Sequence, residues 1–186
     1  MLCCELRLWI LRIHNYVLVA ILCLSSLPLC FAYSMRPDLS GVWIPDGSRS
    51  TFHRTLKAAP GPQTSSAPAP ADSVYRSERI DQKGGTFTIS TLDENEQVIG
   101  TLVLSADGIE AVNEIGAIKH RSVTLWQGNK LVTEWTEERA GEVVRRGKDA
   151  RELSEDESTL TLRKRTDDSA STTESVVVFT KKAAAQ

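Results

Sequence analysis

The chain has 186 residues, enough for one domain, and a formal net charge of −2. It has no basic excess to neutralise phosphates, so the composition argues against a nucleic-acid partner. All four cysteines lie between Cys3 and Cys30. The rest of the chain therefore cannot form disulfides and must be stabilised by packing.

Residues 1–32 have the pattern of an export signal. An uncharged apolar run, Tyr16–Ala32, follows Arg7 and Arg12, and it ends with small residues at Cys30 and at its last position. These features favour cleavage after the run. We expect a secreted or periplasmic protein with no stable membrane insertion after cleavage. The alternative is an uncleaved membrane anchor, although the run is short for a bilayer span of about 20 apolar residues.

A short strand with a Gly-x-Trp motif opens the expected mature chain. It lies in residues 33–57, where Gly41 and Trp43 form the motif and Pro45-Asp46-Gly47 is expected to end the strand. Residues 58–73 are rich in proline and alanine and contain no large apolar side chain. Proline cannot donate to a helix or a sheet, so we predict a flexible, solvated loop in the same domain.

Residues 74–182 alternate between short strands and turn signals at a spacing of about 8–12 residues, and residues 183–186 form a tail. Asp107-Gly108 is a strong hairpin signal. This pattern predicts an all-β fold, an antiparallel up-and-down meander that closes into a lipocalin-like barrel of about 8–10 strands, because closure removes unpaired edges. A flat sandwich is the main alternative. The expected strands are Val74–Ile80, Thr86–Thr91, Val98–Leu104, Ile109–Asn113, Ala117–Trp126, Lys130–Glu137, Glu142–Leu153, one around Leu160 and Leu162, and Ser175–Lys181.

Alternating apolar residues within these strands are expected to fill the barrel. Small barrels often pack their interior with side chains alone. The predicted core residues are Phe87, Ile89, Leu102, Leu104, Val123, Leu125, Leu131, Leu160, Leu162, Val176 and Val178.

The Gly41-Val42-Trp43 motif on a first strand resembles the entry motif of lipocalins and related calycin barrels. More closely, the chain resembles a group of small exported bacterial proteins of unknown function. Their shared motifs occur here as SGVW, Arg49-Ser50, WQGNKL at Trp126–Leu131 and LSEDESTLT at Leu153–Thr161. This resemblance covers most of residues 38–181. It implies a calycin-type barrel closed at one end by Trp43, with an arginine packed over the indole. Arg163 and Arg165 both match that arginine, and Arg163 is the better match.

The sequence offers little catalytic or metal-binding chemistry. Beyond residue 32 there is no cysteine, no Gly-x-Ser-x-Gly elbow and only two histidines, His53 and His120, which we expect on the surface. The acidic turns at Asp93–Glu96 and Glu152–Glu157 lack the glycine and spacing of a calcium loop. We therefore rank an enzyme third, behind a binding barrel and an interaction module, and expect no cofactor or metal ion.

The preferred functional hypothesis is a barrel that binds a small hydrophobic or amphipathic molecule at the end away from Trp43. The candidate ligand-binding residues are Trp126, Trp135, Phe87 and Leu125. The alternative is a structural or protein-interaction module with a solidly packed barrel and no ligand. In that case the charged hairpin within residues 137–152 would be the contact surface. Nothing in the sequence identifies a protein partner.

Overall fold

A computed structural model describes residues 36–57, 64–65 and 75–183. The predicted export signal lies outside these residues, as does most of the predicted loop at 58–73. No helix formed by the described residues is long and apolar enough to cross a membrane. The strands are β1 (Gly41–Leu56), β2 (Thr64–Ser65), β3 (Glu78–Lys83), β4 (Thr86–Leu92), β5 (Val98–Ser105), β6 (Glu110–Ile115), β7 (Ile118–Gln127), β8 (Lys130–Arg139), β9 (Glu142–Leu153), β10 (Thr159–Asp168) and β11 (Ser171–Lys181).

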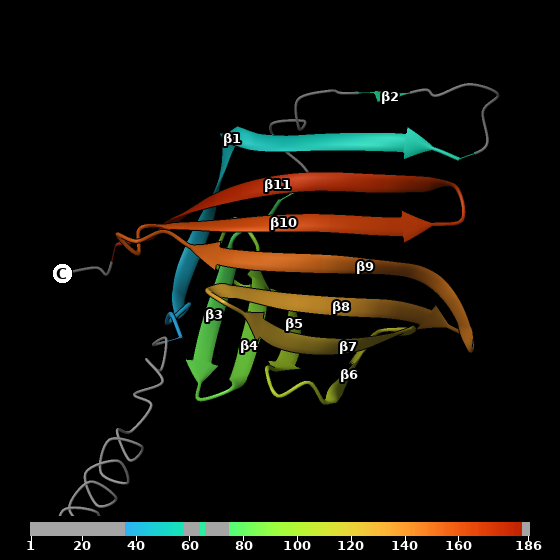
Figure 1. Cartoon of the computed structure of the whole chain (residues 1–186), viewed down its shortest axis with the longest axis horizontal. Coiled ribbons are helices and arrows are strands. Elements are labelled where there is room, and N and C mark those ends of the chain that lie inside the picture. The colour runs from blue at the N-terminus through green and yellow to red at the C-terminus, as the bar shows by residue number, and fades with distance from the viewer. Residues whose placement is uncertain (1–35, 58–63, 66–74, 184–186) are drawn as a thin grey trace, which may run out of the picture. The chain divides into compact units, whose positions relative to one another are not determined.

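The strands form one antiparallel sheet in the order β5-β4-β3-β1-β11-β10-β9-β8-β7-β6, with short β2 paired to β1 (Figure 1). Most strands pair with their neighbours in the chain, as in a meander. β1 lies between β3 and β11 and so joins the first part of the chain to the last. The result is a nearly closed barrel of ten strands, which confirms the predicted fold class.

The barrel is joined at its seam, between β5 and β6, by a side chain instead of a ladder. The hairpin predicted at Asp107-Gly108 is wrong in this respect, because β5 and β6 are the two ends of the sheet order. Asn113 Oδ1 accepts a hydrogen bond from the Val103 N–H at 2.8 Å, and its Nδ2 donates to the Val103 carbonyl at 2.9 Å. The amide of Asn113 thus takes the place of a backbone partner.

β1 continues through Pro45-Asp46-Gly47, where we predicted that it ends. Its register with β11 shifts between Asp46 and Thr51, and Figure 1 shows a sharp bend in the strand. Ser50 Oγ donates to the Asp46 carbonyl at 2.7 Å and accepts from the Val178 N–H at 3.1 Å. This side chain satisfies backbone groups that the irregular ladder leaves unpaired.

The apolar core fills the end of the barrel where β1 begins, which we call the Trp43 end. Trp43 is fully buried, and its Nε1–H donates to the Leu39 carbonyl at 2.9 Å. On β11, Val177 and Phe179 face the core instead of the predicted Val176 and Val178. The core residues are Leu39, Trp43, Ile80, Phe87, Ile89, Leu104, Ala106, Leu131, Leu153, Leu160, Leu162, Val177 and Phe179, with Tyr75 and Trp126 packed against them.

The inward face of β7 is also the opposite of the predicted one. Val123 and Leu125 are 38% and 46% exposed and lie on the outer face, whereas Ser122 and Thr124 are buried. Side chains alternate along a strand, so a change of one position in phase moves every side chain to the other face. The inner surface of the barrel is therefore polar in part.

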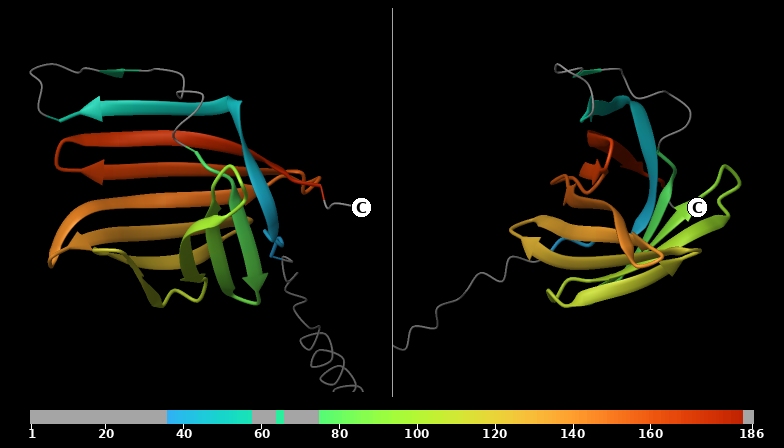
Figure 2. Two further views of the ribbon diagram at one scale, coloured as in Figure 1. Left: turned by 180° about the vertical axis from the view of Figure 1, so that it is seen from behind. Right: turned by 90° about the vertical axis from the view of Figure 1, so that its right-hand side faces the viewer.

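At the opposite end of the barrel, none of β3, β4 and β5 lies across the long strands (Figures 1 and 2). β3, β4 and β5 run across only one end of the long strands, as Figures 1 and 2 show. β3 pairs with β1 only at Gly41–Trp43, and the rest of β1 pairs with β11 and β2. We call the half beyond β3, which includes the turns β8–β9 and β10–β11, the open end.

Candidate functional site

Beyond the core, the inner face of the long strands becomes polar in successive cross-strand rows. In each row the residues are direct partners on neighbouring strands. The rows, taken from the core toward the open end, are Thr124-Thr133-Asp149-Lys164-Ser175, then Ser122-Trp135-Gly147-Thr166-Thr173, then His120-Glu137-Arg145-Asp168. We call these residues, together with Arg151 and Glu78, the inner polar cluster.

Trp135 lies at the centre of this cluster and is 6% exposed. Its Nε1–H donates to Asp149 Oδ1 at 3.0 Å. The His120 ring stacks on the indole with centroids 5.5 Å apart, and the ammonium of Lys164 lies 5.3 Å from the ring centroid. Both groups must move before a ligand could stack on this indole, so Trp135 serves to orient polar side chains.

A line of buried charges connects β9 to β3. Arg151, whose side chain is 6% exposed, places Nη2 3.4 Å from Glu78 Oε2 and Nη1 4.0 Å from Asp149 Oδ2. A buried charge is stable only when it is paired and hydrogen-bonded. These long contacts leave part of the guanidinium unsatisfied: its Nε has no hydrogen-bond partner.

Nearer the open end, His120 and Arg145 flank Glu137. His120 Nδ1 lies 3.8 Å from Glu137 Oε1, and Arg145 Nη2 lies 2.7 Å from Oε2. The imidazole, followed by the guanidinium charge, holds the pKa of the Glu137 carboxyl below its usual range. The prediction that His120 is a surface residue is wrong, since it is 6% exposed, whereas His53 is exposed as predicted.

Four buried polar atoms in the described part of the chain have no hydrogen-bond partner within the protein: Tyr75 Oη, His120 Nδ1, Ser122 Oγ and Arg151 Nε. Three of them belong to the inner polar cluster, and Tyr75 packs against the adjacent core. A buried polar atom without a partner costs about 1–3 kcal/mol. Buried groups without a partner call for an explanation, and a polar ligand bound at this cluster would supply one.

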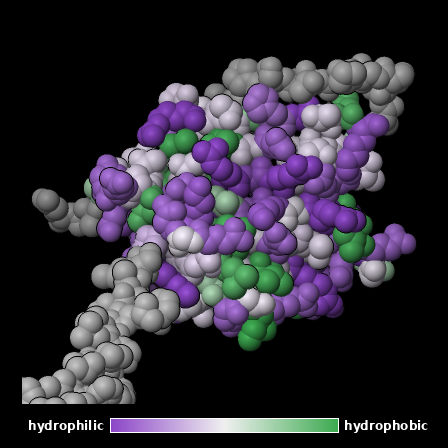
Figure 3. Space-filling view, viewed as in Figure 1, coloured by the Kyte–Doolittle hydropathy of each residue, from purple (hydrophilic) through white to green (hydrophobic). Residues whose placement is uncertain are grey.

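The four residues predicted to bind a ligand fall in three places. Phe87 and Trp126 meet edge to face, with ring centroids 6.0 Å apart, at the border of the core. Trp135 lies in the inner polar cluster. Leu125 lies outside, and Figure 3 shows the apolar surface over β7 and the β5–β6 turn, to which Leu125, Val123 and the exposed Ile109 contribute. The structure therefore brings only two of the four together.

The motif at the Trp43 end contains a cation other than Arg163. The Lys181 ammonium lies 5.3 Å from the centroid of the Trp43 ring, in the arrangement of a cation–π contact. Lys181 is the direct partner of Trp43 on β11, and Gly41 has the φ angle of 147° that favours glycine. Arg163 is exposed, and it lies on the face of β10 opposite to the core residue Leu162.

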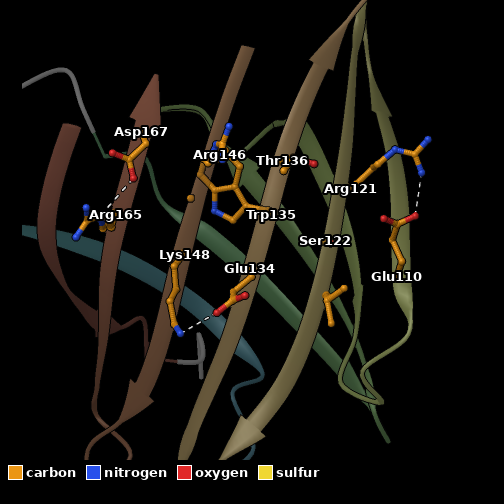
Figure 4. A pocket seen from close by; sticks show the side chains of 12 residues that line it. Glu110, Arg121, Ser122, Glu134, Trp135, Thr136, Arg146, Lys148, Arg165 and Asp167 are labelled. Atoms are coloured by element: carbon orange, nitrogen blue, oxygen red, sulfur yellow. Dashed lines mark hydrogen bonds and ion pairs between the residues drawn. The ribbon is translucent and has the colours of Figure 1, made fainter. Parts of the chain in front are cut away.

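An open groove of about 560 Å³ runs across β6–β10 (Figure 4). Outer-face residues form most of its lining, and Ser122, Trp135 and Gly147 of the inner polar cluster contribute to it. Its charges are largely paired. Lys148 contacts Glu134 at 2.9 Å, and Arg165 contacts Asp167 at 3.3 Å. Because paired surface charges and open walls offer little to desolvate a ligand, the inner polar cluster is the better candidate site.

Sequence reasoning missed Asp149, Arg151 and Lys164, although the pattern held a signal for them. On β9 the inward positions run from Leu153 through Arg151 to Asp149, and on β10 they run from Leu162 to Lys164. An apolar alternation that continues into charged residues, without a change of phase, indicates that those charges face inward.

Comparisons with known proteins assign no family. No protein-family model matches the chain, and no curated protein matches it. Within the described ranges, no group of three or more His, Cys, Asp and Glu side chains is arranged to hold a metal ion.

Proposed function

We propose that this chain is an exported, lipocalin-like barrel that binds a small amphipathic molecule in the open half of its interior. The observation that carries the proposal is the set of unpartnered polar atoms buried on the inner face, beside a packed apolar core. A binding site of this kind combines an apolar wall with a few polar groups that fix the orientation of the ligand.

The distribution of side chains favours entry with the polar end first. Polar groups are buried deep, in the rows around Trp135. The charged row His120-Glu137-Arg145-Asp168 lies nearer the mouth, and apolar side chains lie on the inner face at the two edges of this row. Leu56 pairs with Ser171 and is 41% exposed, and Ile115 pairs with Ile118 and is 42% exposed. A ligand with its polar group inward and its apolar part toward the mouth would cover both sets.

Displacement of Nile red, a neutral apolar dye, tests this proposal with decanoate, decan-1-ol and decyltrimethylammonium as competitors. We expect saturable displacement by at least one of them. Thr173→Trp, which adds bulk on the inner face, should weaken that binding by about tenfold or more. Thr161→Trp, on the outer face of β10, is the matched control and should change nothing. Absence of saturable displacement would instead favour a solidly packed interaction module.

Export is a separate part of the proposal. The support for it is the apolar run of residues 16–32 with its basic flank. Intact-mass measurement of the chain expressed with its full leader should give a species that begins at Tyr33. A chain that retains residues 1–32 in the membrane fraction would contradict cleavage.

A further inference from the structure

We propose that Lys164 anchors an anionic head group, such as a carboxylate, of the amphipathic ligand. This inference rests on the proposed function and specifies the chemistry of its ligand. Lys164 lies in the row next to the core, between Asp149 on β9 and Ser175 on β11. It is partly buried, and its ammonium lies over the Trp135 indole.

The carboxylates of the inner polar cluster are already engaged. Asp149 accepts from the Trp135 indole, and Glu78 contacts Arg151. Glu137 is held by Arg145, and Asp168 accepts hydrogen bonds from the backbone N–H groups of the β10–β11 turn. Each of these carboxylates already accepts a hydrogen bond or contacts a cation of the protein.

Lys164, in contrast to these acids, has no charged partner among the described residues. None of the carboxylates of these residues lies within 4.0 Å of its ammonium nitrogen. Its direct partner Asp149 is turned toward Trp135 and Arg151 instead. Removing an ammonium from water without a counter-charge is costly, and contact with an indole offsets only part of that cost. Among the basic side chains of the inner polar cluster, Arg145 and Arg151 each have a carboxylate within 4.0 Å, so Lys164 is the cation that a ligand carboxylate could pair with.

Neighbouring donors without partners point to the same ligand class. Arg151 Nε and Ser122 Oγ are both buried and have no hydrogen-bond partner. Arg151 lies two residues from Asp149 on β9, and Ser122 is the direct partner of Trp135. An ammonium, a guanidinium N–H and a hydroxyl are donors suited to carboxylate oxygens. A cationic head group would be repelled by the Lys164 ammonium, and the nearby carboxylates already have partners within the protein.

Three ligands with the same chain test the inference by isothermal titration calorimetry: decanoate, decan-1-ol and decyltrimethylammonium. The wild-type protein should bind decanoate at least about tenfold more tightly than the alcohol, and the ammonium most weakly. Lys164→Met keeps the length of the side chain and removes its charge, so it should weaken decanoate binding about tenfold and leave decanol binding unchanged. Lys164→Arg should restore most of the affinity for decanoate.

Lys148→Met is the matched control, because Lys148 lies on the outer face of the adjacent strand, and it should leave all three affinities unchanged. Equal binding of decanoate and decanol by the wild-type protein would overturn the role of Lys164 even if a variant failed to fold. Equal weakening of all three ligands by Lys164→Met would overturn it as well. Binding by none of the three would overturn the proposed function and this inference together.

Discussion

The Trp135 indole can lie against β9 because its cross-strand partner is Gly147. A Cβ at this position would collide with the indole and with the Arg165 carbonyl. Gly147→Ala should therefore displace the indole from Asp149 and destabilise the fold by about 1–3 kcal/mol. Urea unfolding, with near-UV circular dichroism for the indole, measures both effects.

Gly100→Ala is the control for this substitution, since a Cβ there meets nothing within 4 Å. It should have little effect on the free energy of unfolding. If Gly147→Ala proved as stable as Gly100→Ala, with an unchanged near-UV spectrum, the packing described for Trp135 would be incorrect.

Glu137 gives the stability of the fold a defined dependence on pH. Its pKa is lowered in the folded protein, chiefly by His120 and with a contribution from Arg145. The unfolded chain therefore binds the proton more readily than the folded one. The stabilisation is present above the unfolded pKa of about 4.3 and is lost as the pH falls through the lower folded value.

Glu137→Gln should consequently be less stable than the wild type at about pH 5, and the difference should shrink as the pH falls to about 3. Urea unfolding at several pH values measures it. The exposed Glu114, changed to Gln, is the control and should show a smaller dependence on pH. A Glu137→Gln difference that did not change over this range would contradict the assigned contacts.

At the scale of the strands, the seam between β5 and β6 depends on one side chain. Asn113→Leu removes both hydrogen bonds to Val103 and should cost about 1–2 kcal/mol. Asn113→Asp keeps the acceptor for the Val103 N–H and loses the donor, so an intermediate loss is expected. Amide hydrogen exchange at Val103 should become faster in Asn113→Leu and remain slow in Asn113→Asp. Unchanged exchange in the leucine variant would show that the seam has another support.

The strands also explain what the sequence could and could not reveal. Turn signals such as Gly84-Gly85 and Gly128-Asn129 placed most strand boundaries, because few residues adopt these backbone conformations. Alternation separated the two faces of β7 but could not say which one faces inward. Packing decides that, and the inward face proved to hold Ser122 and Thr124.

At the scale of the whole barrel, the turn spacing predicted an antiparallel meander that closes on itself, and the structure confirms a meander that forms a nearly closed barrel. Its closure through β1 brings Lys181 to Trp43, two residues that are far apart in the chain. The inner polar cluster likewise joins Glu78 on β3 to Arg151 on β9. Such contacts depend on the register of strands distant in sequence, so local patterns could not reveal them.

The proposed ligand site lies inside the barrel and not in the outer groove. Intermolecular NOEs between decanoate and the methyl groups of the protein test it most directly. Binding inside the barrel should give NOEs to the inner-face methyl groups of Thr124, Thr133 and Ile118, and none to Val123 or Leu125 on the outer face. NOEs confined to Val123 and Leu125 would contradict it.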